Sequence, residues 1–142
     1  MNFALGSDHA GYELKEKIKT ILKEKNLGYE DFGPFSADSV DYPEYGHKVG
    51  NAIKNNLCSR GIVICGSGNG INMTVNKHQA IRSALCWTEE IAELARLHNN
   101  ANVIAIPARF VSEMLALEMV EKFLNTPFEG GRHARRVDKI SC

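Results

Sequence analysis

The chain has 142 residues and a mass of 15.7 kDa, which is typical of one domain that buries its own core without disulfides. Lysine plus arginine number 17 and aspartate plus glutamate also number 17, so no overall charge favours nucleic acid or anionic lipid as a partner. The four cysteines lack metal-ligand or disulfide spacing and no apolar run could cross a membrane, so we expect a single soluble domain over residues 1–142 in the reducing cytoplasm.

Short apolar runs alternate with amphipathic segments, which is typical of repeated βα units with helices on both faces of a parallel sheet. The predicted strands are residues 3–6, 28–32, 61–65, 81–86 and 102–106. The predicted helices are residues 13–25, 45–56, 70–77, 89–98 and 111–124, with a last short helix in the tail. The expected fold class is therefore α/β, a three-layer Rossmann-like sandwich around a five-stranded parallel sheet.

The first predicted helix has a clear helical period. Its apolar face is formed by Leu14, Ile18, Ile21 and Leu22. Its charged face, expected to point to solvent, is formed by Lys15, Glu16, Lys19 and Lys23. After the second strand, residues 31–42 are predicted to form a surface loop, with Pro43 at a helix start.

A glycine-rich turn, Cys65-Gly66-Ser67-Gly68-Asn69-Gly70, follows the third predicted strand. Backbone N–H groups exposed at such a turn can bind an anion. The turn lacks the third glycine of the dinucleotide fingerprint and the lysine of a nucleotide phosphate loop, which disfavours NAD. A tight βα turn without a ligand is the alternative.

Ligands of an open parallel sheet bind beyond the carboxyl ends of the strands where the strand order reverses, which we expect between the first and third strands. The loops there contain Asp8 and Cys65. A helix N-terminus beside Cys65 favours the thiolate, which suits proton abstraction. The alternatives are a helix cap for Asp8 and a small buried core residue for Cys65, as we expect for Cys58, Cys86 and Cys142.

Two further features contain groups that suit catalysis or anion binding. His98 closes a predicted helix, where the helix dipole also favours a histidine for purely structural reasons. Arg132 and Arg136 are four residues apart, so on a helix they share a face and can bind one phosphate. A solvated basic patch is the alternative for this pair.

Motifs along nearly the whole chain resemble ribose-5-phosphate isomerase type B. They are Gly6-Ser7-Asp8-His9-Ala10-Gly11-Tyr12, Asp41-Tyr42-Pro43, Cys65-Gly66-Ser67-Gly68-Asn69-Gly70-Ile71, Asn76-Lys77, His98-Asn99, Asn102-Val103-Ile104, and Gly131-Arg132-His133 with Arg136. The resemblance implies interconversion of ribose 5-phosphate and ribulose 5-phosphate in the pentose phosphate pathway, without a metal or an organic cofactor. It also implies a homodimer or a dimer of dimers, with active sites near the subunit interface.

The same resemblance assigns roles to individual residues. Cys65 would move a proton between C2 and C1 through a cis-enediolate, with Ser67 polarising the thiol or the sugar oxygens. His98 and Asp8 would open the furanose ring. The substrate would be bound by the N–H groups of Gly66, Gly68, Asn69 and Gly70 at the enediolate, by Tyr42 and Asn99 along the sugar, and by His9, Arg109, Arg132 and Arg136 at the phosphate.

Ile71 occupies the position where some relatives have a glutamate base, which implies that this chain is a cysteine-dependent member. Residues 77–80 depart from the more apolar segment that relatives often have. Isomerases of allose 6-phosphate and galactose 6-phosphate share the architecture, so a six-carbon sugar phosphate is an alternative substrate. An alternative of another class is a non-catalytic nucleotide- or flavin-binding module in which Cys65 is only a core residue.

Overall fold

The computed structural model describes residues 1–142, and a five-stranded parallel sheet lies at its centre. The strands are β1 (Asn2–Ser7), β2 (Gly28–Asp31), β3 (Arg60–Cys65), β4 (Ser83–Leu85) and β5 (Val103–Pro107). Their order across the sheet is β2-β1-β3-β5-β4. The predicted α/β fold is confirmed, and the strand order does reverse between β1 and β3.

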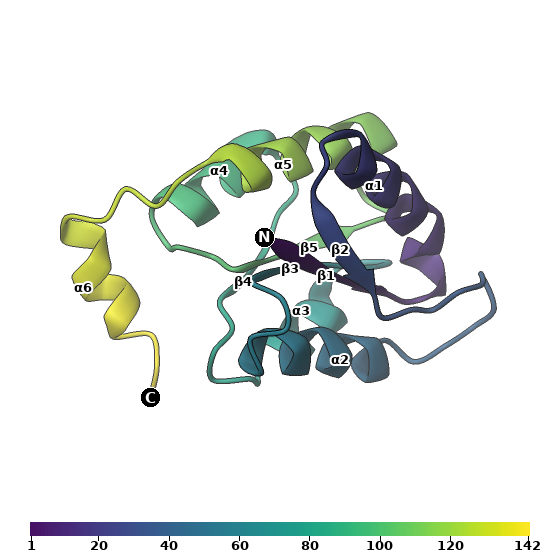
Figure 1. Cartoon of the computed structure of the whole chain (residues 1–142), viewed down its shortest axis with the longest axis horizontal. Coiled ribbons are helices and arrows are strands. Elements are labelled where there is room, and N and C mark those ends of the chain that lie inside the picture. The colour runs from purple at the N-terminus through teal and green to yellow at the C-terminus, as the bar shows by residue number, and fades with distance from the viewer.

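Helices cover both faces of the sheet (Figure 1). One face carries α1 (Tyr12–Glu24), α4 (Glu89–Leu97) and α5 (Glu113–Asn125), and the other carries α2 (Tyr42–Lys54) and α3 (Asn69–Val75). A short 3₁₀ turn, η1 (His9–Gly11), precedes α1, and α6 (Arg132–Asp138) stands apart beyond β4. None of the helices combines the length and the apolar character that crossing a membrane requires.

The core consists of two apolar clusters, one on each face of the sheet, and β5 contributes to both. Ile104 and Ile106 belong to the cluster under α4 and α5, whereas Val103 and Ala105 belong to the cluster over α2 and α3. Successive side chains of a strand point to opposite faces, so a strand buried on both sides reads as a continuous apolar run. This is why β5 was recognisable in the sequence.

Most element boundaries differ from the prediction by one to three residues, and two of these differences have clear local reasons. The strand predicted at residues 81–86 is limited to Ser83–Leu85, because β4 is an edge strand that pairs only with β5 and is half-buried. Helix α2 begins at Tyr42 rather than at residue 45, with Pro43 in its first turn. Proline fits there because the first helical N–H groups need no partner within the helix.

The expectation that Lys15 faces solvent is wrong. Its side chain is buried, and its Nζ donates to Asp31 Oδ1 at 2.7 Å and to the carbonyl oxygen of Pro34 at 2.8 Å. Burial alone would raise the pKa of Asp31, but hydrogen bonds from Lys15 and Lys19 outweigh burial and hold that pKa below its ordinary value. The ion pair makes burial of the lysine possible, because an unpaired buried charge would be too costly.

The cysteines other than Cys65 divide into two groups. Cys58 and Cys86 are buried as expected, and burial raises the pKa of both thiols, that of Cys86 to about 12. Cys142 is exposed, which contradicts the expectation of a buried residue, because the last residues lie outside both apolar clusters.

Candidate active site

The loops that leave β1 and β3 lie against each other at the carboxyl edge of the sheet. The Asp8 N–H donates to the carbonyl oxygen of Ile64 at 3.1 Å, which fixes the first loop beside the end of β3. The buried carboxylate of Asp8 accepts from the Gly11 N–H at 3.0 Å. Asp8 therefore caps η1, which agrees with the helix-cap role that the sequence offered as an alternative to catalysis. The same bond holds the carboxylate in one orientation.

Cys65 is the last residue of β3 and is only 4% exposed. Its carbonyl oxygen accepts from the Ala108 N–H at 3.0 Å, so the backbone is fixed against the loop after β5. The thiol makes no hydrogen bond within the chain, and its side chain belongs to the apolar cluster on the α2 and α3 face, which also contains Ile71. Ile71 is fully buried there.

The glycine turn after Cys65 holds its shape because of Gly68, which has a φ of 75°. A Cβ atom on Gly68 would lie 2.5 Å from Cδ1 of Leu85 and 3.2 Å from the backbone nitrogen of Pro107, so the backbone conformation requires glycine and the space favours it. The Asn69 N–H donates to Ser67 Oγ at 3.3 Å. Within residues 66–71, the N–H groups of Gly66, Ser67, Gly68, Gly70 and Ile71 have no acceptor in the chain. Clustered unpaired N–H donors of this kind suit an anion.

Two further side chains lie against this turn, and a third holds a neighbouring loop at the same edge of the sheet. The ring of Tyr42, at the start of α2, lies so close to Gly70 that a Cβ atom there would overlap it. The Arg109 N–H donates to the Gly66 carbonyl oxygen at 3.0 Å, and its guanidinium lies beside Gly66. His9 Nδ1 accepts from the Val40 N–H at 3.3 Å and so fixes the loop before α2. The carboxyl edge thus combines an acid, a thiol, N–H donors and an arginine.

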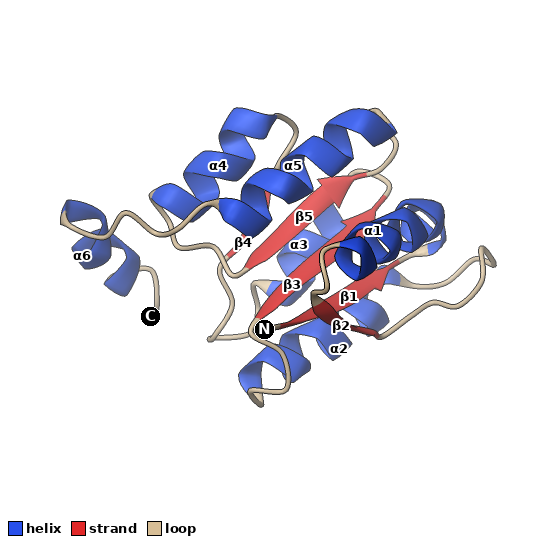
Figure 2. Ribbon diagram, turned by 45° about the horizontal axis from the view of Figure 1, so that its top comes forward, coloured by secondary structure: helices blue, strands red, loops and turns tan.

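The remaining predicted site residues lie at the opposite edge of the sheet. His98 ends α4, which runs back from the end of β4 to the start of β5. The arrowheads of the strands point away from α6, which carries Arg132 and Arg136 (Figure 2). At roughly 3.3 Å per residue, β5 alone separates the two edges by about 13 Å. Within one chain, His98, Asn99, Arg132 and Arg136 are therefore remote from Cys65.

Asn99 is exposed and lines a cavity of about 390 Å³ near the end of the chain, together with Arg82 and Ile140. No residue of the carboxyl-edge group lines this cavity. Arg132 and Arg136 are exposed, and the predicted helix in the tail is confirmed by α6. The residues named here could bind an anionic or polar ligand, but none of them is suited to abstract a proton.

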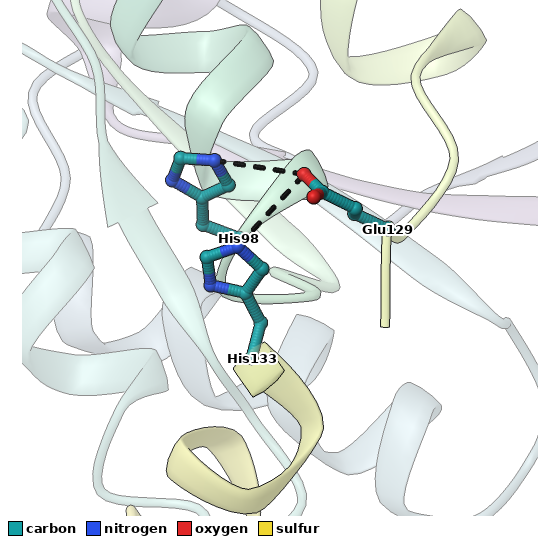
Figure 3. Close-up of side chains that lie close together, drawn as sticks. All are labelled: His98, Glu129 and His133. Carbon is teal, nitrogen blue, oxygen red and sulfur yellow. Dashed lines mark ion pairs between the residues drawn. The ribbon is translucent and has the colours of Figure 1, made fainter. Parts of the chain in front are cut away.

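His98 is part of a cluster that the sequence reasoning missed. Its ring stacks on that of His133 with centroids 4.2 Å apart and planes 12° apart, and Glu129 approaches both rings (Figure 3). Burial lowers the pKa of His133, and His98 lowers it further. The sequence offered one indication of this cluster, the spacing of four residues between Glu129 and His133. His47 and His78, which lacked context in the sequence, also meet, with ring nitrogens 2.9 Å apart.

Comparison with known proteins gives one consistent result. The family model described as Ribose/Galactose Isomerase matches residues 3–140. The chain is 39% identical over 139 residues to "Ribose-5-phosphate isomerase B" of Escherichia coli K12, covering 98% of this chain and 93% of that protein. It is 43% identical over 141 residues to "Probable ribose-5-phosphate isomerase B" of Mycoplasma genitalium, covering 98% and 93%.

Solved structures agree in fold along the whole chain. Ribose-5-phosphate isomerase B of Clostridium thermocellum superposes with a TM-score of 0.96 at 47% identity, covering 99% of this chain and 95% of that one. The Mycoplasma genitalium enzyme, solved with bound ribulose-5-phosphate, superposes with a TM-score of 0.94 at 43% identity, covering 98% and 93%.

Proposed function

The chain belongs to the ribose/galactose isomerase family, and from that premise we propose that it interconverts ribose 5-phosphate and ribulose 5-phosphate with Cys65 as the base. The observation that carries this assignment is the meeting of Cys65, Asp8 and the unpaired N–H groups at the carboxyl edge of β1 and β3. Isomerisation of an aldose needs a base, donors for an enediolate and an anchor for the phosphate.

In the forward direction, the Cys65 thiolate takes the proton from C2 of the open-chain aldose. The electron pair of that C–H bond forms the C1–C2 double bond of a cis-enediolate, and the carbonyl π electrons move to O1. A proton then passes from O2 to O1, which leaves the negative charge on O2. The thiol returns its proton to C1 through the electron pair of the C1–C2 double bond, and the electrons on O2 form the carbonyl at C2. Donors of the glycine turn stabilise the negative oxygens of the enediolate, and Ser67 polarises the thiol or the sugar oxygens.

Ring opening requires Asp8 and His98 at one sugar, although Asp8 follows the end of β1 and His98 precedes the start of β5, at the opposite edge of the sheet. We therefore assign the complete site to a homodimer. One copy supplies Asp8, His9, Tyr42, Cys65 and the glycine turn, and the second copy supplies His98, Asn99, Arg132 and Arg136. Asp8 and His98 then move protons to and from the ring oxygen and the anomeric hydroxyl.

Exposed apolar side chains support such an association. Trp87, Phe110 and Met114 have exposed fractions of 54%, 76% and 69%. Phe110 follows Arg109, so an apolar contact at this position would bring a second chain next to the glycine turn. Tyr42 and Asn99 would orient the sugar, and His9, Arg109, Arg132 and Arg136 would hold the phosphate, for which the guanidinium fork is suited.

We also propose that residues 1–142 form one domain, since all strands join one sheet and both apolar clusters pack on it. A cytoplasmic location fits the four free cysteines. The substrate is tested by comparing kcat/KM for ribose 5-phosphate with that for allose 6-phosphate and galactose 6-phosphate. We expect the five-carbon sugar to be preferred, and a clear preference for a six-carbon sugar would contradict the assignment.

A further inference from the structure

We propose that His98, Glu129 and His133 form a binding site for a first-row transition-metal dication such as Zn²⁺. Nε2 of His98 and Nε2 of His133 each lie 3.8 Å from Oε2 of Glu129. One ligand atom from each residue lies within 4.8 Å of the other two. Two imidazoles and one carboxylate are a ligand set that zinc adopts in proteins with a fourth position left open.

The unpaired, buried ring nitrogen of His133 is the observation that points to a ligand. The residue is 6% exposed, and its buried Nε2 has no hydrogen-bond partner. Buried polar atoms in folded proteins are nearly always paired, so an unpaired nitrogen that lies 3.8 Å from a carboxylate oxygen, on a ring stacked against a second imidazole, needs a partner. A metal ion between the three groups supplies one, and Figure 3 shows the stacked imidazoles of His98 and His133 each with one nitrogen turned toward the same carboxylate oxygen of Glu129.

The backbone holds the three residues in place. The His98 N–H donates to the Leu94 carbonyl oxygen at 2.8 Å, and the Glu129 N–H donates to that of Leu97 at 3.0 Å, which ties the segment before α6 to the end of α4. Gly130 and Gly131 have positive φ values of 72° and 54°, which favour glycine, and the turn that they form brings Glu129 to 3.8 Å from His133. The ligand backbones are therefore positioned before any ion binds.

The side chains must still move. Zinc bonds to imidazole nitrogen are about 2.0–2.1 Å, so tetrahedral ligand atoms lie roughly 3.3 Å apart, closer than the present spacings. The side chains of His98 and Glu129 are 38% and 53% exposed, so they can rotate, and the ion can enter from solvent. Arg132 and Arg136 on the same helix as His133 oppose a dication. We therefore expect reversible binding rather than a permanent structural site.

Metal binding at this site would inhibit the isomerase. This consequence rests on the proposed function, in which His98 transfers a proton during ring opening. A nitrogen that donates its lone pair to a metal cannot accept a proton. The metal is therefore an inhibitor that competes for His98, and it takes no part in the isomerisation.

The test is calorimetric titration of the full-length chain with ZnCl₂ after treatment with a chelator, with MgCl₂ as the control ion. Glu129→Gln and His133→Gln remove one ligand each, and Glu129→Gln affects a half-exposed side chain, so its fold is expected to persist. Matched controls are His78→Asn, which breaks the other histidine pair, and Cys142→Ser, which removes the exposed thiol. The spectrum of a Co²⁺ complex and the isomerase rate with and without Zn²⁺ are recorded for each variant.

We expect one Zn²⁺ per chain at this site in the wild type and in both controls, no binding of Mg²⁺, and a loss of affinity of at least about tenfold in Glu129→Gln and His133→Gln. Unchanged affinity in these two variants, loss of binding in either control, or thiolate charge-transfer bands in the Co²⁺ spectrum would overturn the site. A third outcome separates the two proposals. If Glu129→Gln abolishes Zn²⁺ binding but Zn²⁺ does not change the turnover of the wild type, the metal site is supported and the ring-opening role of His98 is contradicted.

Discussion

The aromatic ring of Tyr42 covers Gly70, so the first residue of α2 closes the glycine turn that follows Cys65. The first turns of α2 and α3, which are far apart in the sequence, thereby lie against each other at the carboxyl edge of the sheet. The shape of the turn depends on this contact as well as on its own glycines.

Gly70→Ala is expected to destabilise the fold by about 1–3 kcal/mol, since the new methyl group overlaps the ring of Tyr42 and displaces α2 or the turn. Urea unfolding measures the change, and kcat/KM should fall with it. The double variant Gly70→Ala with Tyr42→Ala relieves the overlap, so the two changes should be strongly non-additive in the free energy of unfolding. Additive effects would show that the ring and the turn do not share this space.

Cys65→Ala should lower kcat by roughly 10² to 10⁴, because it removes a positioned base, with little change in KM. The rate is measured with ribose 5-phosphate under saturating conditions. Cys142→Ser, the exposed cysteine, provides the matched control and should keep full turnover. A Cys65→Ala enzyme within tenfold of the wild type would remove the cysteine from the base role.

Arg132→Ala should raise KM for ribose 5-phosphate and change kcat much less, since it removes a bond to the non-reacting phosphate. Arg135→Ala alters the neighbouring charge on the same exposed helix and serves as the control. If the two variants have the same KM, the effect of Arg132 is one of general charge rather than of a specific phosphate contact.

Mixing Cys65→Ala with His98→Ala should restore activity that neither variant has alone. In a symmetric dimer, each mixed pair contains one site with both residues intact, so random exchange of chains yields about a quarter of wild-type activity. The two proteins are mixed, incubated to allow exchange and assayed. A chain that carries both substitutions, mixed with Cys65→Ala, should remain inactive. No recovery in the first mixture, with exchange of chains verified, would refute the shared site.

The Lys15–Asp31 ion pair should make the free energy of unfolding decrease at acidic pH. Because the pKa of Asp31 is lowered in the folded state, the pair contributes fully above the ordinary aspartate pKa of about 3.9 and is lost as pH falls through the lower, folded-state value. At neutral pH, Asp31→Asn leaves a buried lysine short of its partner and should cost about 3 kcal/mol.

The difference in unfolding free energy between wild type and Asp31→Asn should shrink as the pH falls below about 4. The exposed pair of Lys17 and Glu113 is the control, and Lys17→Ala should change stability by less than about 1 kcal/mol. A difference that is constant from neutral to acidic pH would mean that the carboxylate charge contributes nothing.

The sequence predicted the sheet because each buried strand is a short apolar run, and it predicted that Asp8 and Cys65 meet because both follow parallel strands. The burial of Lys15 was not predictable from helical period, since its partner Asp31 comes from another element. The separation of His98 from Cys65 follows from topology, because a helix after a parallel strand returns to the opposite edge. The motif resemblance named both residues without revealing that distance.

The position of α6, apart from the sheet and on the side where the strands begin, has a consequence for how this chain can change over time. Under the shared-site arrangement, a substitution at Arg132 alters catalysis at the thiol of another molecule and leaves the nearest thiol of its own chain untouched. Selection therefore acts jointly on two surfaces of one polypeptide that never touch within it. At high dilution the dimer would dissociate, and each separated chain would carry only two incomplete parts of a site. Turnover per chain would therefore decrease as the protein is diluted.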